Sequence, residues 1–290
     1  MCHVFKVSRS GFYAWRQRKS STPTRTEQRR EERFAAIEEA FQKSRKIFGY
    51  RKLHAALRTQ CINCSLNTVH SDCQHHGIKS IVRRKYRVQT TDSKHNHPVA
   101  KNVLNRDFTA SRPNKKWVTD ITYVATHEGW LFVVAILDLF SRKVIGYAMA
   151  DHMRTELVVS ALRMALNRGR KLVGDIWLHT DRGVQFASEQ FRDALQLADI
   201  AQSMSRKGNC WDNAPCESWF GKLRSEWIYP QGVYATREQA KLSIIEYIEM
   251  FYNSKRLHQT LGYKTPNEFE ANYFDATIEL TPCELTSPLK

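Results

Sequence analysis

The central part of the chain carries an order of strand and helix patterns that restricts its fold more than any other feature. Three β-rich runs follow one another at 116–126, 130–139 and 143–150, and their joints, HEG and FSR, are short enough for hairpins. From 155 to 205 the pattern changes to helix, strand, helix and strand. This order predicts an α/β fold with a mixed five-stranded sheet and flanking helices.

Three acidic residues interrupt this pattern where strands and helices bury apolar side chains. Asp120 lies in the middle of WVTDITYV, Asp181 ends DIWLHTD, and Glu217 lies in the first turns of a helix beginning NAPCESWF. A buried carboxylate is costly unless it is paired or bound to a metal ion. If the first and fourth strands are parallel neighbours, the two aspartates lie side by side, and the helix with the glutamate packs across that edge.

Three convergent carboxylates predict a site for hard metal ions. Mg²⁺ prefers carboxylate oxygens and keeps its other positions for water and phosphate. Two such ions about 4 Å apart would activate a water or hydroxyl on one side of a phosphodiester and stabilise the leaving oxygen on the other. The pattern therefore predicts metal-dependent phosphoryl transfer on a nucleic acid.

The first 100 residues differ in charge from the rest of the chain. They contain 21 Lys and Arg against 7 Asp and Glu, whereas residues 101–290 contain 24 against 22. Short helical patterns with a tight turn before the last one, for which we expect Asn67 as cap and Gly77 as stop, predict a helix-turn-helix module. The basic run that follows is expected to contact DNA phosphates through Arg83, Arg84, Lys85 and Arg87.

Several classes of protein are excluded by composition. The longest nearly apolar run, 131–140, is about half a membrane span and contains Asp138. The residues after Met1 lack the apolar stretch and cleavage site of a secretory signal, and seven cysteines at irregular spacing do not form a disulfide framework. We therefore predict a globular protein of the cytoplasm with no membrane partner.

The motifs WVTDITYV, HTDRGVQF and SMSRKGNCWDNAPCESWFGKLRSE together resemble the DDE catalytic core of bacterial insertion-sequence transposases, which are related to retroviral integrases. More specifically, the chain resembles the OrfB product of elements that split their transposase between two reading frames. The 35 residues between Asp181 and Glu217 are typical of that family, 60 residues separate Asp120 from Asp181, and Arg224 supplies its basic residue seven positions after the glutamate. With VSRSGFYAW, FGYRKLHAALR and YNSKRLHQTLGYKTPNEFE, the resemblance covers residue 7 to about 269.

The resemblance implies an RNase H-like fold in which Asp120, Asp181 and Glu217 are the catalytic ligands of two Mg²⁺ or Mn²⁺ ions. The reaction it implies is hydrolytic nicking at element ends, followed by attack of the freed 3′-hydroxyl on another DNA strand. Arg224 lies almost two helical turns after Glu217, so we expect it on the same face and in contact with a DNA phosphate. Lys222 lies off that face and is expected to be an outer DNA contact or solvated.

The resemblance also implies partners and a domain order. The partners are DNA (element ends and target), further copies of the chain assembled on DNA, and an upstream-frame DNA-binding protein of the OrfA type, as a fusion or a separate chain. The chain begins almost directly at VSRSGFYAW, where relatives carry more of a first helix, so we expect end recognition to come largely from that partner. The predicted segments are a partial N-terminal helical segment (1–24), a helix-turn-helix domain (25–87), a linker (88–114), the catalytic domain with C-terminal helices (115–271) and a tail (272–290).

Other polar residues have competing interpretations. We expect Asp138 to cap a turn and not to act in catalysis. His179, two residues before Asp181, is interpreted as a satisfied core histidine, with support of the aspartate as the alternative. Trp219 and Phe220 are interpreted as core residues. Tyr252, Arg256 and His258 are a candidate DNA-facing rim.

A zinc site is the weaker alternative for the N-terminal module. Cys61 and Cys64 have the spacing of a zinc motif, with further candidate ligands downstream. Cys73, however, fits the apolar stripe of the last helix, and the matching family region contains no metal. Two other functions remain as alternatives to a transposase: a non-catalytic DNA-binding protein derived from one, and an RNase H-like nuclease that cleaves without joining.

Overall fold

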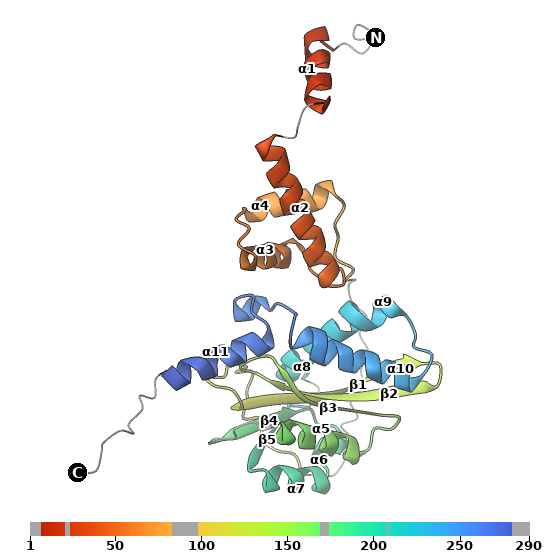
Figure 1. Cartoon of the computed structure of the whole chain (residues 1–290). Coiled ribbons are helices and arrows are strands. Elements are labelled where there is room, and N and C mark those ends of the chain that lie inside the picture. The colour runs from red at the N-terminus through yellow and green to blue at the C-terminus, as the bar shows by residue number, and fades with distance from the viewer. Residues whose placement is uncertain (1–6, 21–23, 83–97, 169–173, 208, 280–290) are drawn as a thin grey trace, which may run out of the picture. The chain divides into compact units, whose positions relative to one another are not determined.

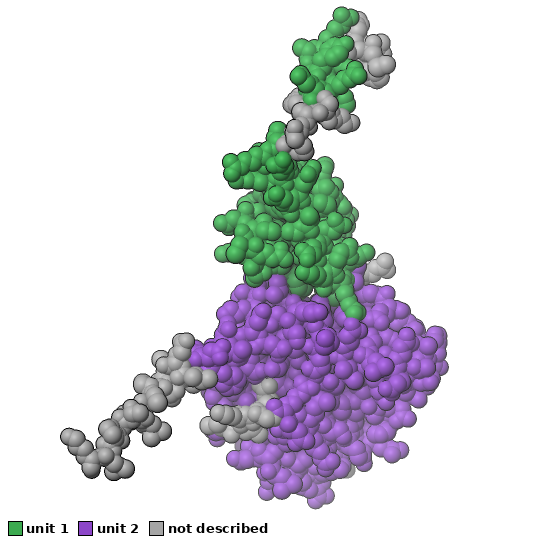
Figure 2. Space-filling view, in the orientation of Figure 1, with its two compact units in different colours: residues 1–80 green, residues 81–290 purple. Residues whose placement is uncertain are grey.

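A computed structural model describes residues 7–20, 24–82, 98–168, 174–207 and 209–279 (Figure 1). The chain divides into two compact units, residues 1–80 and 81–290 (Figure 2). No helix among the described residues is both long and apolar enough to cross a membrane.

In the described part of the first unit, all regular secondary structure is helical. Its helices are α1 (Arg9–Ser20), α2 (Arg25–Lys43), α3 (Tyr50–Thr59) and α4 (Leu66–His75). Apolar side chains of α2, α3 and α4 are buried together, and Arg33 of α2 forms an ion pair of 2.7 Å with the buried Asp72 of α4. Helix α4 begins two residues earlier than a cap at Asn67 predicts. Its cap is Ser65, whose hydroxyl accepts the Thr68 N–H, and not Asn67.

The second unit is built on one mixed sheet. Its elements up to the last strand are β1 (Lys116–Thr126), β2 (Gly129–Asp138), β3 (Val144–Ala150), α5 (Thr155–Asn167), β4 (Ile176–Thr180), α6 (Val184–Ala187), α7 (Glu189–Leu197) and β5 (Ile200–Met204). The strand order is β3-β2-β1-β4-β5, with β1, β2 and β3 antiparallel and β1, β4 and β5 parallel. The predicted five-stranded RNase H-like sheet with flanking helices is confirmed.

Helices cover both faces of this sheet (Figure 1). The elements after β5 are η1 (Cys210–Asn213), α8 (Ala214–Leu223), η2 (Arg224–Ile228), α9 (Tyr229–Gln231), α10 (Arg237–Ile245), η3 (Glu246–Tyr252), η4 (Gln259–Leu261) and α11 (Pro266–Glu279). Helices α5, α6 and α7 lie on one face, and α8 and α10 on the other. Helix α5 lies so close to β3 that a Cβ at Gly146 would be 2.4 Å from the Ala161 carbonyl oxygen, which explains the glycine.

The segment before β1 is part of the second unit. The sequence predicted residues 88–114 as a linker, yet Leu104 and Asn114 are buried, and the N–H groups of Val103 and Leu104 donate to the Ser203 hydroxyl of β5. At the other end, α11 continues past residue 271. The domain boundaries drawn from the sequence stay predictions.

Candidate functional site

The register of two parallel strands brings Asp120 and Asp181 together. Val118 of β1 is the partner of His179 of β4, and each aspartate lies two residues further along its own strand direction. Side chains two residues apart in a strand point to the same face. The two carboxylates therefore lie side by side, where β4 ends and β1 continues.

Helix α8 brings Glu217 to the same edge. The residue before α8, Asn213, donates from Nδ2 to the Thr119 carbonyl of β1 at 3.0 Å, which fixes the start of the helix beside Asp120. Glu217 lies in the first turn of α8, just after this anchor. The negative charge of Glu217 raises the pKa of the Asp120 carboxyl group.

Asp120 has a pKa well above the usual range for a carboxyl group. Loss of solvent around the group is the largest cause, and the charges of Asp181 and Glu217 raise the pKa further. The Ile121 N–H, which donates to Asp120 at 2.8 Å, and the guanidinium of Arg224 lower it. Three carboxylates thus repel one another at this edge, and a bound cation would neutralise that repulsion.

Arg224 lies near enough to Asp120 for its charge to lower the pKa of that carboxyl group. Its guanidinium donates to the Thr122 hydroxyl of β1 and is half-buried. In the arrangement that the structure describes, no group of three or more His, Cys, Asp or Glu side chains among the placed residues could hold a metal ion. By their charge and chemistry, the carboxylates are suitable ligands for a divalent cation. As placed among the described residues, their side chains do not form a complete set of metal ligands.

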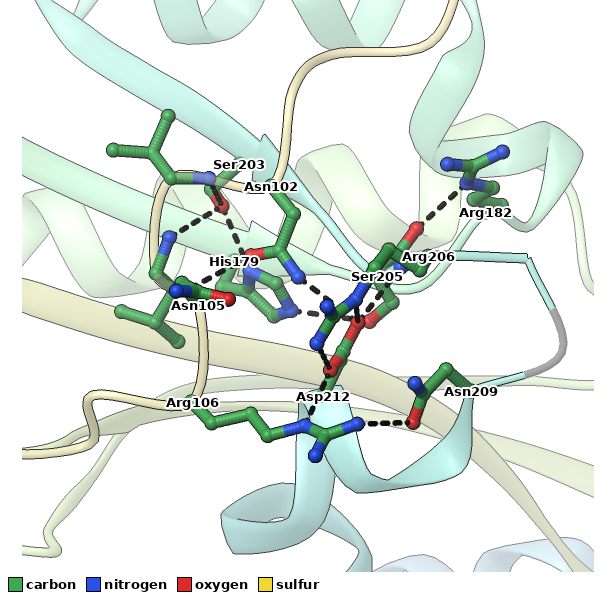
Figure 3. A network of polar contacts seen from close by, with 12 residues as sticks. Asn102, Asn105, Arg106, His179, Arg182, Ser203, Ser205, Arg206, Asn209 and Asp212 are labelled. Atoms are coloured by element: carbon green, nitrogen blue, oxygen red, sulfur yellow. Dashed lines mark hydrogen bonds and ion pairs between the residues drawn. The ribbon is translucent and has the colours of Figure 1, made fainter.

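The loop between β5 and α8 is held by a buried acid that the sequence analysis missed (Figure 3). Asp212 is fully buried, and its carboxylate accepts from Asn102 at 2.9 Å, Arg106 at 3.0 Å, and the backbone and guanidinium of Arg206 at 2.8–3.0 Å. These bonds hold the pKa of Asp212 well below its usual range. At the start of the loop, Arg182 donates to the Ser205 carbonyl at 2.6 Å.

His179 is a satisfied core histidine, as expected. It is fully buried, with Nδ1 2.9 Å from the Ser203 hydroxyl and Nε2 3.0 Å from the Ser205 hydroxyl. The Ser203 hydroxyl oxygen already accepts two backbone N–H groups, so the Ser203 hydroxyl donates its proton to Nδ1 of His179. The other ring nitrogen, Nε2, therefore carries the ring proton and donates to the Ser205 hydroxyl. The Ser205 hydroxyl in turn donates to the Thr180 carbonyl. This chain of bonds requires the neutral ring, and burial lowers the pKa of His179 to about 4.

The stability of the chain should therefore fall in mild acid because of His179. In the unfolded chain the pKa of this histidine is about 6.5. Between pH 6.5 and 4, His179 therefore binds a proton in the unfolded state but not in the folded state. We expect this to lower the free energy of unfolding by up to about 3 kcal/mol. Denaturant unfolding at pH 7.5 and pH 4, compared between the natural chain and His179→Asn, measures it. An equal pH dependence in both proteins would contradict the expectation.

Not every predicted DNA contact lies where the sequence placed it. Arg256 is buried and forms an ion pair with Glu226, so its predicted place on a DNA-facing rim is corrected. His258 and Tyr252 of the same candidate rim are buried as well. Lys222 is half-buried, and burial together with the charges of Arg256 and Arg142 lowers its pKa to about 8. Four predicted contacts lie outside the described residues: Arg83, Arg84, Lys85 and Arg87.

Packing decides the interpretation of Asp138, Trp219 and Phe220. Asp138 is fully buried and accepts the backbone N–H groups of Asn114 and Phe140, at 2.7 and 2.8 Å, which is the turn-capping role expected for it. Trp219 and Phe220 are core residues. In the first unit Cys73 is buried in the core while Cys61 is exposed, and within the placed residues no zinc-binding cluster forms.

Comparisons with protein families agree with this architecture. An "Integrase core domain" model matches residues 110–210, a second model of the same description matches 198–266, and an "HTH-like domain" model matches 28–86. The fold and these matches define a class: proteins that join an integrase core to a helix-turn-helix-like unit.

Curated relatives define the family. The chain is 39% identical over 273 residues to the "Insertion element IS600 uncharacterized 31 kDa protein" of Shigella sonnei, covering 94% of this chain and 98% of that protein. It is 38% identical over 270 residues to "Transposase InsF for insertion sequence IS3A" of Escherichia coli strain K12, covering 93% and 92%. The chain belongs to this family, the insertion-sequence transposases of the InsF type, whose general function is DNA transposition.

Solved structures of retroviral proteins are also similar. One is the simian T-cell lymphotropic virus intasome in complex with the PP2A regulatory subunit B56 gamma, at 15% identity and a TM-score of 0.45, covering 83% of this chain and 78% of that one. Another is the HTLV-2 integrase catalytic core domain in complex with magnesium, at 18% identity and a TM-score of 0.41, covering 56% and 99%.

Proposed function

We propose that the chain is the catalytic subunit of a DDE transposase, which nicks DNA at the ends of an insertion sequence and joins the freed 3′-hydroxyl to another DNA strand. One observation carries the proposal: the parallel register of β1 and β4 supports Asp120 and Asp181 as neighbours, and helix α8, anchored to β1 through Asn213, carries Glu217 beside them. A site that crowds carboxylates at one edge of a sheet is suited to divalent cations and phosphate.

Each residue of the site has a role in this proposal. Asp120, Asp181 and Glu217 hold two Mg²⁺ or Mn²⁺ ions, which when bound activate the attacking oxygen and stabilise the leaving one. The Gly183 N–H, which donates to Asp181 at 2.9 Å, orients that carboxylate. Arg224, oriented by the Thr122 hydroxyl, binds a phosphate beside the carboxylates.

DNA binding outside the site is assigned to the basic regions. The helix-turn-helix unit and the run containing Arg83, Arg84, Lys85 and Arg87 contact the DNA backbone, and Lys222 is an outer contact. An OrfA-type partner recognises the element ends, and two or more copies of the chain assemble on the DNA. We propose the cytoplasm as the place of this activity.

A strand-transfer assay tests the proposal. Labelled element-end DNA is incubated with Mg²⁺ or Mn²⁺ and either the lone chain or its fusion with the upstream frame. We expect joined products from the fusion, and their loss when a chelator removes the metal. Nicking without joining would favour the nuclease, and DNA binding with neither reaction would favour the non-catalytic DNA-binding protein.

A further inference from the structure

The loop that leads to Glu217 presents one large aromatic ring to solvent. Trp211 is 64% exposed, which makes it the most exposed of the seven tryptophans, while Trp117, Trp219 and Trp227 are buried. No ring contact of Trp211 occurs within the described part of the chain. Trp15 and Trp130 are also about half exposed, but Trp211 differs from them by its place in the loop that leads to Glu217. An exposed indole has a face on which another ring can stack.

The backbone beside this ring is fixed. The next residue, Asp212, is fully buried and accepts five hydrogen bonds from Asn102, Arg106 and Arg206 (Figure 3). The residue after that, Asn213, is bonded to the Thr119 carbonyl of β1. Trp211 is therefore followed by two residues whose side chains are held by hydrogen bonds, and it lies six positions before Glu217 in the chain.

The loop that carries the ring also carries basic side chains. The guanidiniums of Arg106 and Arg206 bind Asp212 on one side, and their side chains remain 46% and 47% exposed. Lys207 is exposed in the same loop. The acid of the loop, Asp212, is buried and already bonded. Basic side chains in the same loop as an exposed aromatic ring are an arrangement suited to single-stranded nucleic acid, with phosphates on the cations and a base stacked on the ring.

We infer that Trp211 stacks on an unpaired base of the DNA strand bound at the carboxylates, and that the Asp212 network holds the ring in place for this contact. The inference rests on the proposed function, since it takes DNA at Asp120, Asp181 and Glu217 as the ligand. A base inside a duplex has both faces covered by its neighbours, so the ring selects DNA whose end is frayed. The ring would thereby hold the strand open next to the phosphate that reacts.

The test measures DNA binding without metal, so that no reaction takes place. The full chain is titrated into a fully paired short duplex and into the same duplex with a few unpaired bases at one end, one of them a fluorescent adenine analogue. We expect tighter binding to the frayed duplex and quenching of the analogue. Trp211→Ala should bind the frayed duplex about tenfold more weakly or worse and leave the analogue unquenched, while its affinity for the paired duplex stays nearly unchanged.

Two variants make the test specific. Trp211→Phe keeps a stacking face and should retain most of the preference for frayed DNA. Trp130→Ala is the matched control, because Trp130 is 51% exposed but lies in the β1–β2 hairpin against Tyr123, with ring centroids 4.7 Å apart. It should bind both duplexes as the natural chain does. Since Trp211 is exposed, its loss should leave the unfolding midpoint unchanged.

Other outcomes overturn the inference. If Trp211→Ala keeps the preference for frayed DNA and still quenches the analogue, the ring does not stack on a base. If it changes only the oligomeric state in sedimentation, the ring is a contact between copies. The variant Asp181→Asn tests the proposed function independently of the stacking inference. A chain that still joins DNA with this substitution refutes the assigned metal site, whatever Trp211 does.

Discussion

Asp120→Asn, Asp181→Asn and Glu217→Gln are each expected to lower strand transfer by at least about a thousandfold, because each removes a ligand worth several kcal/mol of transition-state stabilisation. The free energy of unfolding should stay unchanged or rise, since each substitution removes one of three charges that repel one another. Asn at 120 and 181 keeps an oxygen for the Ile121 and Gly183 N–H groups. Strand transfer and denaturant unfolding on the same preparations measure both effects.

Asp138→Asn is the matched control for these substitutions. Asp138 is also buried, but its oxygens accept two backbone N–H groups, and an amide can accept only one of them while its NH₂ group faces the other. We expect it to cost about 1–3 kcal/mol of stability while strand transfer per folded molecule is retained. A carboxylate variant that keeps joining would be removed from the site, and a loss of joining in Asp138→Asn would add that residue to it.

The sheet could be predicted from the sequence because its signals are local. Alternation within 116–126 and 143–150, together with two short joints, fixes the antiparallel part, and the change of period after 155 fixes the parallel part. Asp120 and Asp181 follow from the same reasoning, since parallel neighbours place the two positions at one edge. The prediction of Asn67 as helix cap was wrong because Ser65, two positions earlier, is an equally good residue type for a cap.

The polar networks could not be predicted because their partners lie far apart in the chain. Asp212 is bonded to Asn102 and Arg106, about a hundred positions earlier, and no periodicity links them. Residues 98–114 have the polar composition of a linker, yet Leu104 is bonded to β5 and Asn114 to Asp138 of β2, through contacts that only the folded chain supplies. Arg256 was misplaced for the same reason, since a lone arginine near a helix end gives no sign of a buried acid thirty positions earlier.

This buried acid, Glu226, is the basis of the second prediction with a large expected effect. Arg256 donates from Nε to Glu226 at 2.7 Å and pairs through a second nitrogen, and both side chains are about 5% exposed. The Tyr247 hydroxyl also donates to Glu226, at 3.2 Å. Arg256→Met leaves the glutamate charged and buried without its cation, so we expect it to lower the free energy of unfolding by about 3–5 kcal/mol.

The double variant Arg256→Met/Glu226→Met separates this role from DNA binding. Removing both charges of a buried pair often costs little, so it should recover most of the stability lost in the single variant. Lys43→Met, which breaks the exposed pair with Glu39, should cost at most about 0.5 kcal/mol. If Arg256 acts only in the interior, the double variant binds DNA with the natural affinity and salt dependence. A shallower salt dependence would return Arg256 to the DNA interface, because each lost phosphate contact lowers that slope by about one.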